Sequence, residues 1–105
     1  MKIKQTEKLK AMIEDACVDA YDDDEQLTGL FTMIEEHLAI PFETEVLGVS
    51  VQVISVEVTD ECRIVTICRR DKRSQRIALE DLPLPSPPPL GADWIAAYRL
   101  WSQSR

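Results

Sequence analysis

A run of four acidic residues is the feature of this sequence that is best suited to chemistry. Asp22, Asp23, Asp24 and Glu25 are consecutive. Calcium takes about six to eight oxygen ligands from carboxylates, backbone carbonyls and water. The run therefore predicts a calcium site. The alternative interpretation is an Asp-rich turn that caps a helix and keeps the surface soluble.

Other acidic residues follow at positions that can add ligands. Glu35 and Glu36 come near the end of the next predicted helix, and Asp60 lies in a predicted turn that would reach the site if its hairpin folds against the helices. We favour Asp23, Asp24, Glu35 and Glu36. The complete set of predicted metal ligands is Asp22, Asp23, Asp24, Glu25, Glu35, Glu36 and Asp60.

The segment 24–35 can be compared with the calcium loop of an EF-hand. Gly29 and Glu35 occupy positions six and twelve of that loop, as the motif requires. Gln26 and Thr28, however, stand where Asp or Asn ligands belong. The apolar residues of this segment have the spacing of one face of a helix; they are Leu27, Leu30, Phe31 and Ile34. We therefore predict a calcium site that is not an EF-hand.

The composition excludes several other kinds of site. One histidine and three scattered cysteines do not form a zinc motif. The three glycines do not occur at the spacing of a phosphate-binding loop. No nucleophile stands near a plausible base, so we expect no enzyme activity. Cys17, Cys62 and Cys68 are expected to be buried, reduced thiols.

Negative charge is concentrated in the first part of the chain. The 105 residues carry a net charge of -7, and residues 1–45 hold twelve of the nineteen acidic residues beside four lysines. The predicted helix over 7–21 has lysines before and in its first turns and acids at its far end, an order that opposes the helix dipole. We interpret this conflict as a sign of function, since a bound cation would relieve it.

Two helices are predicted to position the acidic run. Apolar residues recur at helical spacing over 7–21 and again over 25–38, and Pro41 ends the second pattern. Asp22 followed by Glu25 three residues later fits a capping box. The acidic run therefore lies at the tip of a helical hairpin.

The middle of the chain has the period of β-strands. Alternation from Glu45 to Val58 changes phase between Val53 and Ile54, which predicts a β-bulge and a bend. Further strands are predicted over 63–69 and 75–79, with short connections that favour antiparallel hairpins. These segments predict a small, bent antiparallel sheet of three to five strands, or a partial barrel.

The remaining segments complete an α+β fold. The proline-rich segment 82–90 is expected to run as polyproline II, and residues 92–102 form a C-terminal helix. Length favours a single domain over 1–105. No segment has the length and hydropathy of a membrane span or secretion signal, so we expect a soluble, cytoplasmic protein.

Two functions from other classes remain open. A protein–protein interaction module without a metal would dock a partner through the acidic helix pair or the proline-rich segment. A nucleic-acid interface would use the basic residues within 69–76. The acidic net charge and the lack of aromatic residues among these bases make nucleic-acid binding the weaker alternative.

Short motifs in a characteristic order extend over residues 13–101. They are Asp19-Ala-Tyr21, Asp24-Glu-Gln26, Ile34-Glu-Glu36, Pro41-Phe42, Val46-Leu-Gly48, Cys68-Arg-Arg70 and Ala96-Ala-Tyr98-Arg99-Leu-Trp101. In this order and spacing the chain resembles the cyanobacterial-type calcium-binding protein family, small acidic domains that bind calcium without an EF-hand. The resemblance implies an intracellular calcium buffer or sensor with Ca²⁺ as its ligand. It assigns no individual ligand.

Overall fold

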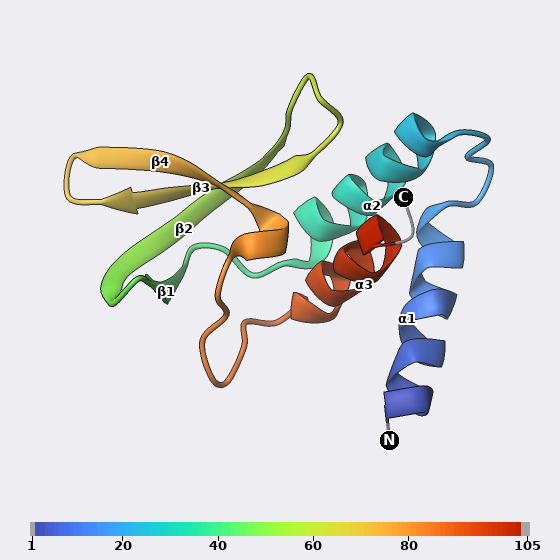
Figure 1. Cartoon of the computed structure of the whole chain (residues 1–105), viewed down its shortest axis with the longest axis horizontal. Coiled ribbons are helices and arrows are strands. Elements are labelled where there is room, and N and C mark those ends of the chain that lie inside the picture. The colour runs from blue at the N-terminus through green and yellow to red at the C-terminus, as the bar shows by residue number, and fades with distance from the viewer. Residues whose placement is uncertain (1, 104–105) are drawn as a thin grey trace. The chain divides into compact units, whose positions relative to one another are not determined.

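The chain folds into three α-helices, four β-strands and one 3-10 helix, seen in a computed structural model that describes residues 2–103, with side chains from Gln5 onward (Figure 1). The elements, in chain order, are α1 (Lys2–Ala16), α2 (Asp23–His37), β1 (Phe42–Val46), β2 (Val49–Val58), β3 (Ile64–Arg70), β4 (Arg73–Ala78), η1 (Leu79–Asp81) and α3 (Ala92–Gln103). This arrangement confirms the predicted α+β class.

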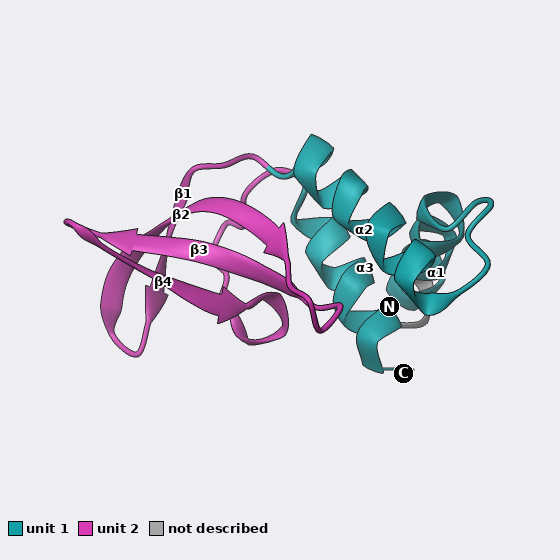
Figure 2. Ribbon diagram, turned by 90° about the horizontal axis from the view of Figure 1, so that it is seen from above, with its two compact units in different colours: residues 1–38, 91–105 teal, residues 39–90 magenta. Residues whose placement is uncertain are grey.

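The chain divides into two compact units, coloured separately in Figure 2. The helical unit contains α1, α2 and α3 and is built from both ends of the chain, up to residue 38 and from residue 91 onward. The sheet unit contains the four strands, η1 and the proline-rich segment, residues 39–90. The single domain expected from length stays a prediction.

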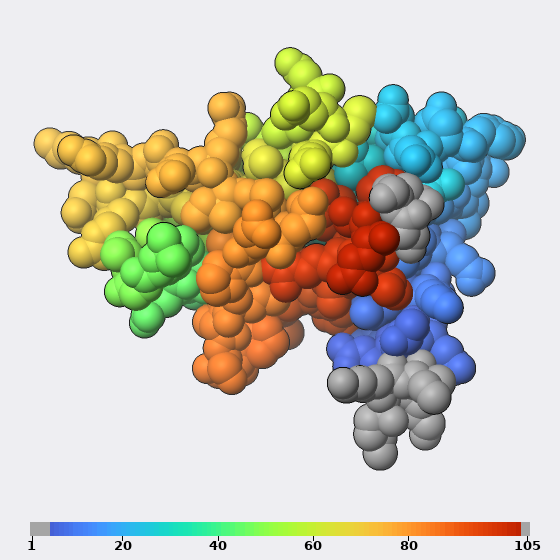
Figure 3. Space-filling model, viewed as in Figure 1, coloured from blue at the N-terminus to red at the C-terminus, as the bar shows by residue number. Residues whose placement is uncertain are grey.

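The helical unit has a core made by α2 and α3. Leu27, Leu30 and Ile34 form the buried face of α2, at the three- and four-residue spacing of one helical face. Tyr98 and Trp101 are buried on α3, where the Trp101 indole N–H donates to the Gln26 side-chain oxygen at 2.8 Å. Figure 3 shows α3 (red) and α1 (blue) side by side, so segments from opposite ends of the chain share one surface.

The first helix starts and ends earlier than the pattern predicted. The expected span was 7–21, whereas α1 ends at Ala16, with one more helical hydrogen bond from the Cys17 N–H to the Ile13 carbonyl at 2.9 Å. Asp19 then adopts a left-handed conformation, φ 64°, which an aspartate tolerates better than most residues. The chain changes direction at Asp19. The second helix, α2, begins at Asp23, two residues earlier than predicted.

Two glycines permit close backbone contacts in the helical unit. A Cβ on Gly29 would collide with the Ala16 carbonyl, so α1 and α2 meet where α2 has no side chain. A Cβ on Gly91 would collide with the His37 carbonyl, and Gly91 also has a positive φ of 86°. The end of α2 and the start of α3 are therefore adjacent.

The sheet is an open antiparallel meander in the order β1-β2-β3-β4. The pairing of β2 with β3 shifts register between Val53 and Ser55, which confirms the predicted bulge. The region from Glu45 to Val58 is not one strand, however. A two-residue turn at Leu47 and Gly48, both with positive φ, separates β1 from β2.

The two faces of the sheet differ in chemistry. The apolar face is defined by cross-strand partners such as Val51 with Thr44, Val53 with Cys68, and Thr66 with Ile77. Val53, Thr66 and Cys68 are buried on it. The opposite face has exposed polar groups, among them the Arg76–Glu57 ion pair at 3.3 Å.

The cysteines differ from expectation. Cys68 is buried and Cys17 is half-buried, but Cys62 is exposed in the β2–β3 connection, where it has a positive φ of 60°. Its place in a turn, outside the alternation of a strand, explains the exposure.

The proline-rich segment has no helix or strand between Leu82 and Pro89, in agreement with its composition. Within the sheet unit, the Thr44 hydroxyl donates to the Pro83 carbonyl at 2.6 Å, and the Ala39 N–H donates to the Leu90 carbonyl at 2.8 Å. Among residues 2–103, no helix is long and apolar enough to cross a membrane.

Candidate metal centre

The acidic run lies at the start of α2. Asp22 is the N-cap, and its carboxylate accepts the Glu25 N–H at 2.9 Å. The Glu25 carboxylate in turn accepts the Tyr21 N–H at 3.2 Å. The predicted cap is thus confirmed for Asp22, while the return bond of the capping box reaches Tyr21 and not Asp22. One oxygen of each carboxylate serves the fold.

The position of the run corrects our interpretation of its charge. We expected the acids to lie at the unfavourable C-terminal end of a helix. Asp23, Asp24 and Glu25 instead occupy the first turn of α2, where the positive end of the dipole stabilises carboxylates. Glu14 and Asp15, in the last turn of α1, keep the unfavourable order.

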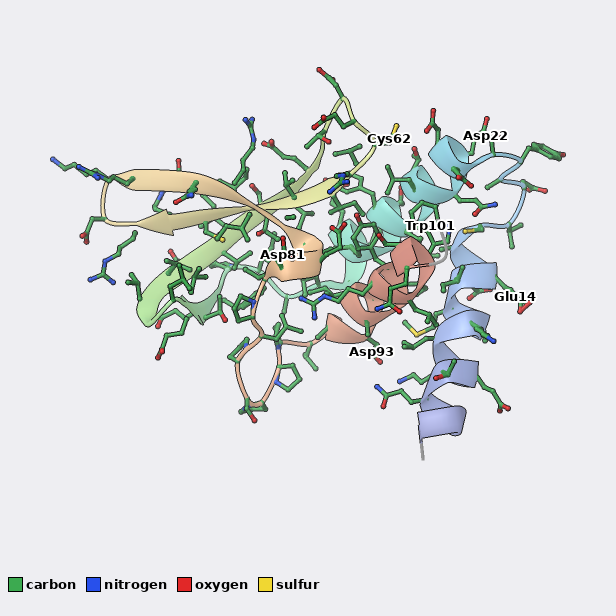
Figure 4. All side chains as sticks on the ribbon, in the orientation of Figure 1. Glu14, Asp22, Cys62, Asp81, Asp93 and Trp101 are labelled. Atoms are coloured by element: carbon green, nitrogen blue, oxygen red, sulfur yellow. The ribbon has the colours of Figure 1, made fainter. Side chains whose placement is uncertain are left out.

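The α1–α2 connection and the start of α2 border a shallow, open hollow of about 390 Å³. We call residues 17–25 the acidic connection. Three acidic residues, Asp19, Asp24 and Glu25, are among those that line the hollow. Its other lining residues are Ala16, Val18, Ala20, Thr28 and Gly29. Figure 4 shows Asp22 at the same end of α2.

Asp19 is a candidate ligand that the sequence prediction missed. It stands three residues before the run, in the first of the short motifs that carry the family resemblance, and its left-handed backbone turns the chain back toward α2. Its acidity was visible in the sequence. The turn that brings it to the hollow was not.

The other predicted ligands lie elsewhere. Glu35 and Glu36 are in the last turn of α2, about 16 Å from Asp24 along the helix axis at 1.5 Å per residue. One ion cannot contact both ends, since calcium–oxygen distances are about 2.3–2.6 Å. Asp60 lies in the β2–β3 connection, in the sheet unit.

No ready-made cage exists within residues 2–103, where no three His, Cys, Asp or Glu side chains are arranged to hold a metal ion. Carboxylates would have to rotate toward a bound ion. Which acidic residues are ligands stays a prediction.

Residues 24–35 do not have the conformation of an EF-hand loop. All twelve lie within α2, whereas an EF-hand loop curls around its ion. The apolar spacing that favoured a helix here is confirmed.

The donor chemistry of the acidic connection fits a hard cation. Five carboxylates, from Asp19 and the four-residue run, lie at or beside the start of α2, and all five residues are exposed. The helix N-terminus opposes a cation with only about half a positive charge. The negative charge of the five carboxylates is larger than this partial positive charge. Ligands at this surface also lose little hydration, so charge attraction is not cancelled by burial.

The structure thus combines an α+β fold with an exposed cluster of hard oxygen donors at the start of α2. A family model described as calcium binding, that of the CcbP calcium-binding proteins, matches residues 10–102. The chain belongs to this family, and Ca²⁺ is its ligand. The resemblance found in the short motifs is confirmed. Comparisons with curated proteins and with solved structures found no match.

Proposed function

We propose that this protein is a calcium buffer that binds the ion at the acidic connection, without an EF-hand. Asp19, Asp24 and Glu25 are the proposed central ligands, and Asp22 and Asp23 add negative charge. The observation that carries this proposal is the hollow that has three of these acidic residues among its lining residues. Bound calcium would complete its coordination with backbone carbonyls and water.

A buffer fits the local structure better than a sensor. A sensor couples the ion to an element with two packed arrangements. The acidic connection, in contrast, precedes a helix that is already capped by Asp22 and packed through Leu27 and Leu30. Rotation of exposed carboxylates is enough to form the site, so the core can stay as it is.

The first experiment is calorimetric titration of the chelator-treated protein with calcium, in a background of magnesium and salt. One variant combines Asp19→Asn, Asp24→Asn and Glu25→Gln, which remove charge but keep the side-chain shape. The side-chain amide oxygen introduced by Glu25→Gln can still accept the Tyr21 N–H, and the Asp22 cap is intact. We expect at least a tenfold loss of affinity, about 1.4 kcal/mol or more.

The matched control combines Glu35→Gln and Glu36→Gln at the opposite end of the same helix. We expect it to keep its affinity within about threefold, because screened charges about 16 Å away contribute little. An unchanged affinity in the triple variant, or a larger loss in the control, would place the site elsewhere. Asp60→Asn tests the remaining predicted ligand in the same assay.

Amide chemical shifts distinguish a buffer from a sensor. With calcium, we expect shifts concentrated in residues 16–29. Large changes that extend through α3, whose Tyr98 and Trp101 are buried, would indicate repacking of the helical core and therefore a sensor.

A further inference from the structure

The apolar face of the sheet is open at one end. There, a hollow of about 560 Å³ lies between the β1–β2 and β3–β4 hairpins. Val46, Val49, Val51 and Ile77 supply apolar walls, and none of the residues that line the hollow is acidic. We call this hollow the sheet groove.

Two arginines face each other at the groove. Arg70 and Arg73 are direct cross-strand partners and both line it. Like charges in such a pair destabilise a hairpin. Arg70 is held by a hydrogen bond to the Ser50 carbonyl at 2.9 Å, and within residues 2–103 neither guanidinium has a carboxylate partner. The pair is therefore available to bind an anion.

Leu47 extends this surface in an unusual way. Its side chain is 98% exposed, although leucine is apolar, and its φ of 50° lies in a region that leucine avoids. Asparagine or glycine would suit this turn position better. A residue that is unfavourable for both solvation and backbone conformation is typical of a binding surface.

The acidic connection has the complementary chemistry. It presents two exposed apolar side chains, Val18 at 67% and Tyr21 at 87%, between and beside its carboxylates. An exposed tyrosine with acidic neighbours matches an apolar groove with a pair of arginines. Tyrosine is also a frequent anchor in protein interfaces.

We propose that the sheet groove docks the acidic connection of a second copy of this chain. Tyr21 enters the apolar groove, Arg70 and Arg73 contact the carboxylates of the connection, and Leu47 covers the rim. Because the two surfaces differ, each molecule can bind two neighbours, so association continues beyond a dimer into rings or filaments.

Analytical ultracentrifugation of the full chain tests this proposal. The measurements are made with a calcium chelator present, so that the result does not depend on the proposed calcium site. We expect association that grows with protein concentration and weakens with added salt. A chain that stays monomeric up to about 1 mM at low salt would overturn the proposal.

Variants in the groove identify the surface. Arg70→Glu with Arg73→Glu should weaken association at least tenfold. The matched control is Arg69→Glu with Arg76→Glu, which makes the same change of charge on the same hairpin but on the opposite face. Equal losses in both variants would show that net charge, and not the groove, controls association.

A charge exchange then tests the pairing. The chain with Asp23→Lys and Asp24→Lys should not associate alone, but it should associate when mixed with the Arg70→Glu, Arg73→Glu chain. No association in the mixture, with both chains folded by circular dichroism, would overturn the proposal.

Leu47→Asn separates docking from folding. Asparagine favours the turn conformation, so the variant should be at least as stable as the parent while its association weakens several-fold. Unchanged association would exclude Leu47 from the interface.

Discussion

At the scale of single residues, the junction of α1 and α2 depends on a missing side chain. Gly29 is inside a helix, where alanine is normally favoured by about 1 kcal/mol. Here a methyl group would meet the Ala16 carbonyl, which belongs to the backbone and cannot rotate away. The steric cost therefore exceeds the gain in helix propensity.

We predict that Gly29→Ala lowers the free energy of unfolding by about 1–3 kcal/mol, the usual cost of overpacking. Urea denaturation measures the change. Thr32→Ala is the control, since Thr32 is exposed on the same helix. A neutral Gly29→Ala would mean that α1 moves away from α2 without loss.

A second residue-scale feature joins α1 to α3. The Lys8 ammonium lies 2.8 Å from the Asp93 carboxylate, and this hydrogen bond, with a smaller contribution from a backbone bond, lowers the pKa of Asp93 below its ordinary value of 3.8. Both side chains are about half exposed or more, so water screens the pair.

We predict that Lys8→Gln lowers the free energy of unfolding by less than about 1 kcal/mol at neutral pH. A lowered pKa in the folded state stabilises the protein above the ordinary pKa, and this contribution disappears as pH falls through the lowered value. The parent and the variant should therefore converge at strongly acidic pH in urea denaturation. A difference that grows with acidity would exclude the pair as its cause.

At the scale of elements, α2 uses its acidic start in two ways. Asp22 satisfies a backbone donor at the N-terminus of α2, while Asp24 and Glu25 line the hollow that we propose as the calcium site. The same charge cluster therefore combines a structural cap with the proposed ligands, and mutations can separate the two roles.

We predict that Asp22→Ala destabilises the protein by about 0.5–2 kcal/mol through loss of the cap, and that Asp22→Ser restores most of it. Thermal denaturation without calcium measures both. Asp23→Ala, one residue further along the helix, serves as the control and should cost less. Equal losses would assign the effect to helix-dipole charge alone.

The elements that the sequence predicted are those with a regular pattern of apolar side chains. The phase change at Ile54 revealed the bulge because side-chain alternation has a strict period of two. The β1–β2 turn was missed because Leu47 does not resemble a turn residue. The end of α1 was missed because the left-handed backbone of Asp19, in the turn that follows the helix, has no apolar signature. For the same reason, the hollow could not be predicted from the acidic run alone.

At the scale of the whole molecule, the two units can be followed by different probes. Both tryptophans, Trp94 and Trp101, lie in α3 and report on the helical unit. Amide exchange in β2 and β3 reports on the sheet unit. The two units can therefore be followed separately in one sample.

We predict that calcium at a hundred times its dissociation constant stabilises the helical unit by about 2.7 kcal/mol. Tryptophan fluorescence during urea denaturation measures this shift. Amide exchange in β2 and β3 shows whether the sheet unit shares it. A fluorescence midpoint that calcium does not move would contradict a calcium site in the helical unit.

The helical unit is interrupted in sequence by the whole sheet unit, and this order has a consequence for synthesis. Leu27, Leu30 and Ile34 leave the ribosome early, but α3, which supplies Tyr98 and Trp101 to the same core, emerges more than fifty residues later. Until then the apolar face of α2 lacks its partner. A nascent chain stalled before Gly91 would present that face to chaperones, although all residues of the sheet unit are already synthesised.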